Sequence, residues 1–336
     1  RKYRSSTLLE RENSIWDFYL SQNLLCYRLK PDSGFPVVAI MKSFRPIWSK
    51  FIKHFRAQFP EFYEKLPALI DLTRLNRPVG IYLLLWPTIT ALWIASEGFP
   101  SFSLFIIFVL GTAVMRSAGC CVNDFADYNI DGKVLRTEQR PLPRGALKRQ
   151  DAFLCFFVLS AIGFLLVLLT NWKTVLLSFG AVALIAIYPF MKRYSNLPQL
   201  VLGLAFSWGI LMAFTAKTNE IPQAAYLLFI ANVLWTIAYD TQYAMVDREF
   251  DVKIGVKSTA ILFGDADRLI IGVLQGMFII TLWLAARQFQ MGTVFYASLG
   301  VASLLLIYQQ YLIRHRLPGP CFKAFINNNW VGAVIF

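Results

Sequence analysis

Long apolar runs alternate with short polar segments from about residue 79 to the end of the sequence. A membrane-spanning helix needs about 20 mostly apolar residues, and nine runs approach that length. They lie at about 79–96, 101–122, 151–170, 174–190, 198–216, 222–241, 269–287, 293–312 and 322–336. The pattern predicts an all-α, polytopic membrane bundle of nine transmembrane helices. The ninth run reaches Phe336, so we expect this last helix to be truncated.

The composition supports a membrane protein rather than a soluble domain. Hydrophobic residues make up 57% of the 336 residues and charged residues only 16%, whereas soluble domains carry about 25% charge. The net charge of +13 therefore indicates basic loops and affinity for anionic lipid, and no nucleic-acid partner is expected. Two histidines and five cysteines without paired spacing predict neither a Cys/His metal site nor a disulfide framework.

Basic residues are unevenly distributed among the loops. The loops at 123–150, 191–197, 242–268 and 313–321 are rich in Lys and Arg, whereas the intervening loops carry only Lys173, Lys217 and Arg287. Because basic loops of membrane proteins face the cytoplasm, this alternation predicts that the rich loops and the N-terminal part lie on the cytoplasmic side.

The first 76 residues differ from the rest. Residues 1–40 are polar and form a predicted extension without a functional role, and Met41 resembles a natural start. Residues 41–76 contain a basic amphipathic pattern typical of a helix on the membrane surface, although Pro60 interrupts the pattern and leaves a loop as an alternative. Residues 77–336 are predicted to form the transmembrane domain.

An acidic segment follows the second apolar run. Asn123, Asp127 and Asp131 are spaced i, i+4, i+8, so on a helix they fall on one face. Clustered carboxylates at a membrane surface repel each other unless a cation joins them. Hard oxygen ligands of this kind suit Mg²⁺, which keeps several waters and shares itself with substrate phosphates.

A second acidic segment repeats the first 120 positions later. Asp127 and Asp131 recur as Asp247 and Asp251, and Asn123 corresponds to Tyr243. A single acidic run is equally well explained as a solvated loop. Two copies that each close an apolar run indicate an internal repeat and favour a functional site.

The two segments bring acids and bases to one side of the membrane. The acids are Asp124, Asp127, Asp131, Asp240, Asp247 and Asp251, and the bases are Lys133, Arg136, Arg140, Lys192, Arg193, Lys253 and Lys257. This mixture suits a diphosphate bridged by Mg²⁺, and an apolar tail on it would explain a membrane location. Loss of the diphosphate would leave an allylic cation, which Tyr188, Tyr239 and Tyr243 could surround. The alternative role for these tyrosines is the interfacial aromatic belt.

The combined motifs resemble the UbiA superfamily of membrane prenyltransferases, and within it the branch that prenylates 4-hydroxybenzoate. The resemblance rests on N-D-x-x-D-x-x-x-D at 123–131, R-x-x-x-R-P-L-P-x-G at 136–145 and D-x-x-Y-A-x-x-D-x-x-x-D at 240–251. Further similar stretches lie at 77–88, 188–193, 238–248, 255–264 and 321–332, and the likeness covers about 66–336.

The resemblance implies a fold, a reaction and a location. The helices would surround a central cavity in a bacterial inner membrane, with the active-site loops on the cytoplasmic side. The enzyme would transfer a polyprenyl group from polyprenyl diphosphate to the carbon ortho to the hydroxyl of 4-hydroxybenzoate, a step of ubiquinone biosynthesis.

The resemblance also implies roles for individual residues. The Mg²⁺ ligands would be Asn123, Asp127 and Asp131 in the first motif and Asp247 and Asp251 in the second. Substrate would be bound by Arg136, Arg140, Lys192, Arg193, Arg77 and Lys253. Arg77 or Arg74 would pair with the acceptor carboxylate, although ordinary membrane anchoring explains Arg74 equally well.

Three residues are predicted to take part in catalysis. Asp247 would serve both metal and acceptor, with Tyr243 beside it, because a base near the phenol would activate the ring. A carboxylate beside Mg²⁺ is a weak base, which argues against this role, and Arg193 could instead stabilise the phenolate.

Three other protein classes share parts of this pattern. Nine apolar runs exclude a soluble prenyl synthase with two Asp-rich motifs. The D-G-x-x-A-R run of a CDP-alcohol phosphotransferase is absent after Asp131. An ion-coupled transporter stays an alternative, although its acids would lie within the membrane at an inverted repeat.

Overall fold

The computed structural model describes residues 54, 56–132 and 137–336. The chain divides into two units, Arg1–Glu64 and Lys65–Phe336. The predicted extension at 1–40 and most of the predicted surface helix before Pro60 lie outside the described residues. Residues 56–58 are helical, the helix stops at Phe59, and Pro60 begins a new helix, α3 (Pro60–Thr73); the interruption expected at Pro60 is confirmed, and the missing N–H of proline costs nothing in a first turn.

Every regular element in the described part of the chain is helical. After α3 come α4 (Val79–Ala95), α5 (Phe102–Ala126), α6 (Tyr128–Asp131), α7 (Arg149–Val167), α8 (Trp172–Tyr194), α9 (Pro198–Thr218), α10 (Ala225–Ile254), α11 (Thr259–Phe263), the 3₁₀ turn η1 (Gly264–Ala266), α12 (Asp267–Gln288), α13 (Thr293–Ile313) and α14 (Pro318–Ile335). Within the described residues, each of the nine predicted apolar runs overlaps one of these helices along most of its length.

Six segments of the described chain are long and apolar enough to cross a membrane. They are Phe102–Ala126, Arg149–Val167, Trp172–Tyr194, Pro198–Thr218, Thr259–Gln288 and Thr293–Ile313. A shorter apolar helix lies at Val79–Ala95. The all-α membrane character is therefore confirmed, whereas the count of nine crossings stays a prediction.

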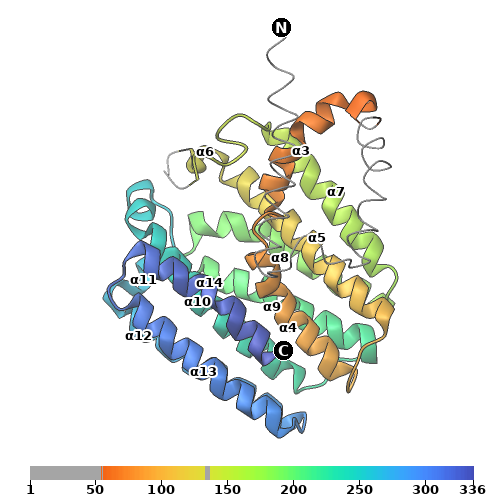
Figure 1. Ribbon diagram of the computed structural model, residues 1–336, viewed down its shortest axis with the longest axis vertical. Coiled ribbons are helices and arrows are strands. Elements are labelled where there is room, and N and C mark those ends of the chain that lie inside the picture. The colour runs from red at the N-terminus through yellow and green to blue at the C-terminus, as the bar shows by residue number, and fades with distance from the viewer. Residues whose placement is uncertain (1–53, 55, 133–136) are drawn as a thin grey trace, which may run out of the picture. The chain divides into compact units, whose positions relative to one another are not determined.

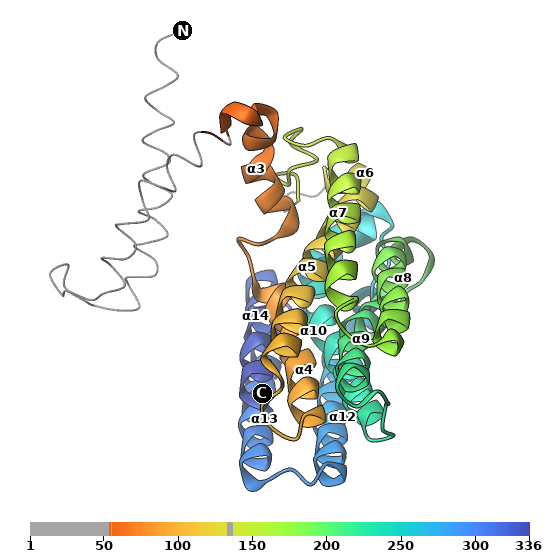
Figure 2. The same cartoon turned by 90° about the vertical axis from the view of Figure 1, so that its right-hand side faces the viewer.

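The long helices of the second unit form a closed ring. Each of α4, α5, α7, α8, α9, α10, α12, α13 and α14 contacts the next in that order, and α14 packs back against α4. Figure 2 shows these helices side by side with their axes close to one direction. Additional contacts of α9 with α4 and of α14 with α10 fill the middle of the ring. The ring therefore places the ends of α5 and α10 beside the same interior space.

Helix ends near this interior are fixed by local backbone chemistry. Gly255 ends α10 with a left-handed φ of 72°, and its N–H and the next one are bonded to Val252 O and Asp251 O. This is the C-terminal geometry that glycine adopts without strain. The chain then turns back, and the N–H of Lys257 donates to Lys192 O of α8 at 3.0 Å. The end of α10 is therefore tied to α8.

Side-chain amides join four helices inside the unit. Trp235 Nε1 of α10 donates to Asn328 Oδ1 of α14 at 2.8 Å, and Asn328 Nδ2 donates to Gln242 Oε1 at 3.0 Å. Gln309 Oε1 of α13 accepts from Gln242 Nε2 at 3.1 Å and from Gln275 Nε2 of α12 at 2.9 Å. Because buried polar groups need partners, this network restricts how the four helices can rotate against each other.

Candidate functional site

A cavity of about 540 Å³ lies inside the second unit, and both aspartate motifs border it. Its apolar wall comes from α4, α9 and α14, including Leu83, Phe206, Phe322, Phe325 and Ile326. The charged and polar residues of its wall are Arg74, Arg77, Arg116, Asn123, Asp127, Asp131, Thr137, Arg140, Tyr188, Lys192, Gln199, Tyr239, Asp240, Tyr243, Asp247, Asp251, Lys257 and Ser258. The cavity wall therefore combines charged with apolar side chains, as an amphipathic substrate requires.

The first motif keeps helical spacing across a short break. Helix α5 ends at Ala126, Asp127 caps it, and α6 continues to Asp131. The N–H of Asp127 donates to Asn123 O and that of Asp131 to Asp127 O, both at 2.9 Å. The i, i+4 register is thus preserved across the break, and all three residues line the cavity.

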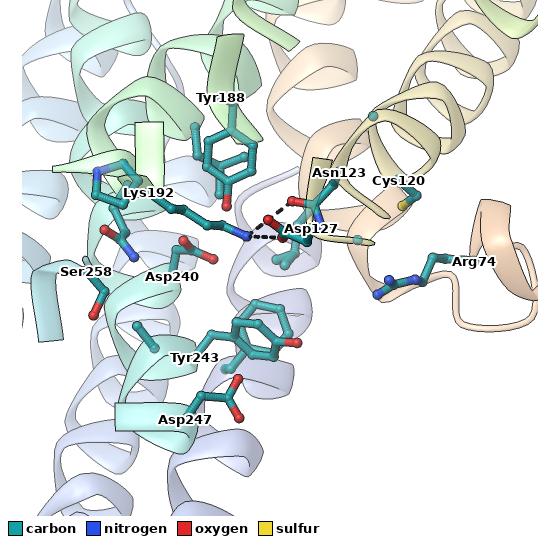
Figure 3. A pocket seen from close by; sticks show the side chains of 18 of the residues that line it. Arg74, Cys120, Asn123, Asp127, Tyr188, Lys192, Asp240, Tyr243, Asp247 and Ser258 are labelled. Atoms are coloured by element: carbon teal, nitrogen blue, oxygen red, sulfur yellow. Dashed lines mark hydrogen bonds and ion pairs between the residues drawn. The ribbon is translucent and has the colours of Figure 1, made fainter. Parts of the chain in front are cut away.

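Lys192 of α8 neutralises the beginning of this motif. Its Nζ lies 3.0 Å from Asp127 Oδ2 and 3.2 Å from Asn123 Oδ1, as Figure 3 shows. The same ammonium lies 5.6 Å from the centre of the Tyr188 ring. Asp127 is 5% exposed, so the lysine supplies the countercharge that a buried carboxylate needs.

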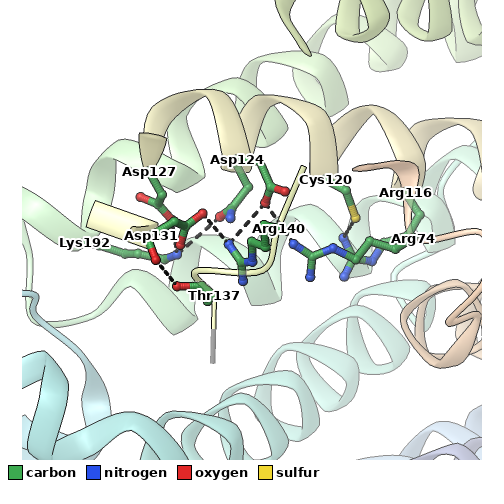
Figure 4. Close-up of polar contacts among 10 residues, drawn as sticks. Arg74, Arg116, Cys120, Asp124, Asp127, Asp131, Thr137, Arg140 and Lys192 are labelled. Carbon is green, nitrogen blue, oxygen red and sulfur yellow. Dashed lines mark hydrogen bonds and ion pairs between the residues drawn. The ribbon is translucent and has the colours of Figure 1, made fainter. Parts of the chain in front are cut away.

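Arg140 neutralises the end of the motif. Its Nη1 lies 2.6 Å from Asp131 Oδ2 and 3.2 Å from Asp124 Oδ1, and Arg74 Nη2 contacts the same Asp124 oxygen at 2.8 Å (Figure 4). Burial raises the pKa of the Asp131 carboxyl above its ordinary value; the Arg140 guanidinium opposes this rise, whereas Asp124 and Asp127 add to it. Asp124 therefore holds Arg74 and Arg140 in position beside the cavity, although Asp124 itself does not line the cavity.

The second motif lies on α10. Asp240, Tyr243, Asp247 and Asp251 all line the cavity, because spacings of three and four place them on one helix face. Figure 3 shows Asp240, Tyr243 and Asp247 along that face. The Tyr243 ring packs against Phe325 of α14, with 4.8 Å between the ring centres.

Arg116 of α5 belongs to the cavity wall and was missed in the sequence. Its Nη1 donates to Cys120 Sγ at 2.9 Å, which is a weak acceptor. Its buried Nε has no hydrogen-bond partner among the described residues. Figure 4 shows the side chain beside Cys120. A signal was present, because an arginine inside a predicted membrane helix indicates a functional site.

Not every predicted substrate-binding residue reaches the cavity. Arg193 is exposed and donates to the backbone oxygen of Ala126, and the exposed Lys253 lies 5.7 Å from the centre of the Phe250 ring. Both predictions are corrected on this point: neither side chain lines the cavity, because each lies on a helix face turned away from it. Arg77 lines the cavity as expected. Arg136 lies outside the described residues.

The donor set suits Mg²⁺, although the structure does not assemble a complete metal site. In the described ranges, no three His, Cys, Asp or Glu side chains are close enough together to hold one ion. Each motif nevertheless presents carboxylates to the cavity. Mg²⁺ commonly takes one or two carboxylates and completes its shell with water and substrate phosphates, so the residues fit a metal that arrives with its diphosphate.

A model of the UbiA prenyltransferase family matches residues 84–331 of the chain. The chain belongs to the UbiA prenyltransferase family. Two UbiA relatives, both named 4-hydroxybenzoate octaprenyltransferase, come from Pseudomonas aeruginosa strain LESB58 and Saccharophagus degradans. The match to the first is 58% identical and covers 80% of this chain and 90% of the relative. The match to the second is 57% identical and covers 81% of this chain and 91% of the relative.

Solved structures of UbiA homologues have the same fold. An apo UbiA homologue from Aeropyrum pernix K1 matches with a TM-score of 0.69 at 24% identity, over 76% of this chain and 94% of that chain. A UbiA homologue from Archaeoglobus fulgidus bound to GPP and Mg²⁺ matches with a TM-score of 0.60 at 21% identity. This match covers 80% of this chain and 99% of that chain. At these identities the likeness supports the fold alone.

Proposed function

We propose that this protein transfers a polyprenyl group from polyprenyl diphosphate to 4-hydroxybenzoate, at the ring carbon ortho to the hydroxyl. The observation that carries the proposal is one cavity that is lined both by the two aspartate motifs and by aromatic and aliphatic side chains. Relatives at 57–58% identity are named for this acceptor. The product serves ubiquinone biosynthesis, and the transporter alternative has no support from the family.

The donor diphosphate would bind beside the two aspartate motifs. Asn123, Asp127 and Asp131 would hold Mg²⁺ on one side, and Asp247 and Asp251 on the other. The metal would supply Lewis-acid stabilisation of the leaving diphosphate. Lys192 and Arg140 line the cavity, so their charges can also stabilise the oxygen that becomes negative as the C–O bond breaks. The prenyl chain would extend along the apolar side chains of the wall.

The aromatic side chains would stabilise the allylic cation. Tyr188, Tyr239, Tyr243 and Phe325 line the same cavity, and π-faces attract a cation while excluding water that would otherwise capture it. The ring carbon of 4-hydroxybenzoate then forms a bond to the cation. A proton leaves that carbon, so the products are 3-polyprenyl-4-hydroxybenzoate, diphosphate and H⁺.

Arg116 is the best candidate for the acceptor carboxylate. Arg74 already contacts Asp124 at 2.8 Å, so it is committed to the protein. Arg77 is exposed, at the cavity mouth. Arg116 instead offers a half-buried guanidinium whose only hydrogen-bond partner among the described residues is a thiol sulfur, which leaves donors for a bidentate carboxylate. Arg116 therefore replaces Arg74 as the proposed partner of the acceptor carboxylate, and Arg77 becomes the second candidate for that role.

Asp247 would accept the proton of the acceptor hydroxyl during ring attack and return it to that oxygen when the ring carbon loses its own proton, so that one H⁺ is released overall. It lines the cavity one turn after Tyr243, and its carboxylate would also touch the metal, which lowers its basicity. The protein would work in a bacterial inner membrane with the cavity mouth toward the cytoplasm. Basic residues concentrated in alternate loops support this orientation.

The proposal is tested with membranes that carry the protein. Labelled prenyl diphosphate, 4-hydroxybenzoate and Mg²⁺ should give a labelled prenylated acid, and EDTA should abolish the product until Mg²⁺ is restored. A panel with naphthoate and homogentisate acceptors provides the comparison. Preference for either acceptor would refute the substrate assignment, and full turnover in EDTA would refute the metal.

A further inference from the structure

A second cluster of charges lies behind the second motif, away from the cavity wall. Asp267, at the start of α12, has a completely buried side chain. Arg248 Nη1 of α10 lies 3.0 Å from its Oδ2. Arg316, in the turn between α13 and α14, approaches Oδ1 with its Nη2 at 2.9 Å and both oxygens with its Nε at 3.0 Å. None of the three residues lines the cavity.

This cluster is a firm junction between three segments. A buried carboxylate is costly unless it is fully paired, and Asp267 is satisfied from both sides, with the N–H of Arg268 also donating to its Oδ1 at 2.6 Å. Arg316 holds a left-handed φ of 55° and donates to Asp265 O at 2.8 Å. Arginine rarely adopts that backbone conformation, so the turn is held by these side-chain bonds.

The position of Arg248 connects this junction to the cavity. It follows Asp247 directly and precedes Asp251 by three residues. Successive helical residues point about 100° apart, so Arg248 reaches α12 while Asp247 and Asp251 face the cavity. A rotation of this end of α10 would break the pair with Asp267 and turn both carboxylates away.

We infer that Asp267 is a positioning residue, which through Arg248 fixes the direction of the Asp247–Asp251 pair toward the substrate diphosphate. The inference rests on the proposed function, which assigns that pair to Mg²⁺ and diphosphate. Neither Asp267 nor Arg248 touches substrate. They act by holding the carboxylates of Asp247 and Asp251 in the orientation that binding requires. A small displacement of such groups weakens binding and slows the reaction.

Arg248→Gln is the most informative variant, because Asp267 keeps its bonds from Arg316 and stays neutralised. We expect the dissociation constant of an uncleavable prenyl thiodiphosphate, measured with Mg²⁺, to rise about tenfold. The KM for 4-hydroxybenzoate should change less than twofold. Arg248→Lys, whose ammonium can still pair with Asp267, should restore most of the donor affinity. Asp267→Asn should reproduce the donor defect.

Matched controls separate position from charge. Arg268→Gln removes the same charge from an exposed side chain one residue after Asp267, and Asp265→Asn makes the same change as Asp267→Asn at an exposed site. The inference would be overturned if Arg248→Gln binds the donor with an affinity within twofold of that of Arg268→Gln, while Asp251→Asn binds the donor weakly. Unchanged donor binding in Asp251→Asn would instead refute the proposed role of the aspartate pair itself.

Discussion

Replacing Arg116 by glutamine should separate acceptor recognition from donor binding. If the guanidinium pairs with the acceptor carboxylate, its removal leaves that carboxylate in a cavity without its countercharge. Truncating one partner of a buried charge pair costs about 2–5 kcal/mol. A loss near 3 kcal/mol is roughly a hundredfold in kcat/KM for 4-hydroxybenzoate.

The same substitution should not destabilise the protein. Among the described residues, Arg116 has one hydrogen bond, to Cys120 Sγ, and its guanidinium lies 5.7 Å from the centre of the Phe206 ring. Its loss removes a half-buried charge that has little compensation. We therefore expect the thermal midpoint of the detergent-extracted protein to stay equal or to rise.

The assay compares two acceptors at saturating donor. Wild-type protein should strongly prefer 4-hydroxybenzoate to the neutral 4-hydroxybenzamide, and Arg116→Gln should lose most of that preference while the KM for prenyl diphosphate changes less than threefold. Arg193→Gln removes a charge from an exposed side chain outside the cavity and is the matched control. An unchanged acceptor preference in Arg116→Gln would refute the assignment.

Four further substitutions test other parts of the site. Asp127→Asn and Asp251→Asn should each lower turnover by orders of magnitude with normal membrane insertion, and near-wild-type rates in either would exclude it as a metal ligand. Asp247→Asn should keep donor affinity yet abolish aromatic transfer; a donor defect equal to that of Asp251→Asn would reduce Asp247 to a metal ligand. Gly80→Ala places a Cβ 2.7 Å from Arg116 Nε and Nη2, so the KM for acceptor should rise about tenfold although alanine favours the helix by about 0.5–1 kcal/mol. An unchanged acceptor KM would show that Arg116 can shift without consequence.

The helices could be predicted from the sequence because lipid exposure requires continuous apolar runs. The run expected at 198–216 is α9 (Pro198–Thr218), and that expected at 293–312 is α13 (Thr293–Ile313). The run at 222–241 ends too early, since α10 continues to Ile254. A polar helix end beyond the membrane gives no hydropathy signal, yet this end carries Asp247 and Asp251.

The aspartates of the site were also predictable, because their spacing repeats along the chain. The direction in which each basic side chain points could not be predicted. Lys192 and Arg193 are neighbours in sequence, but only Lys192 faces the cavity, and a difference of about 100° around a helix is invisible without knowing which face packs inward. Arg116 was overlooked for the opposite reason, since the hydropathy of the surrounding run concealed a single charge.

The ring of helices makes biogenesis dependent on α14, the last of the described helices to be synthesised. Until α14 arrives, the indole N–H of Trp235 lacks Asn328 as its acceptor, and the side of α4 that α14 covers remains open. An unsatisfied donor in hydrocarbon is costly, so the nascent bundle without α14 carries a polar group that only the complete ring satisfies. Packing of α14 against α4 and α13, rather than membrane insertion of the first helices, is then the event that closes the ring around the cavity.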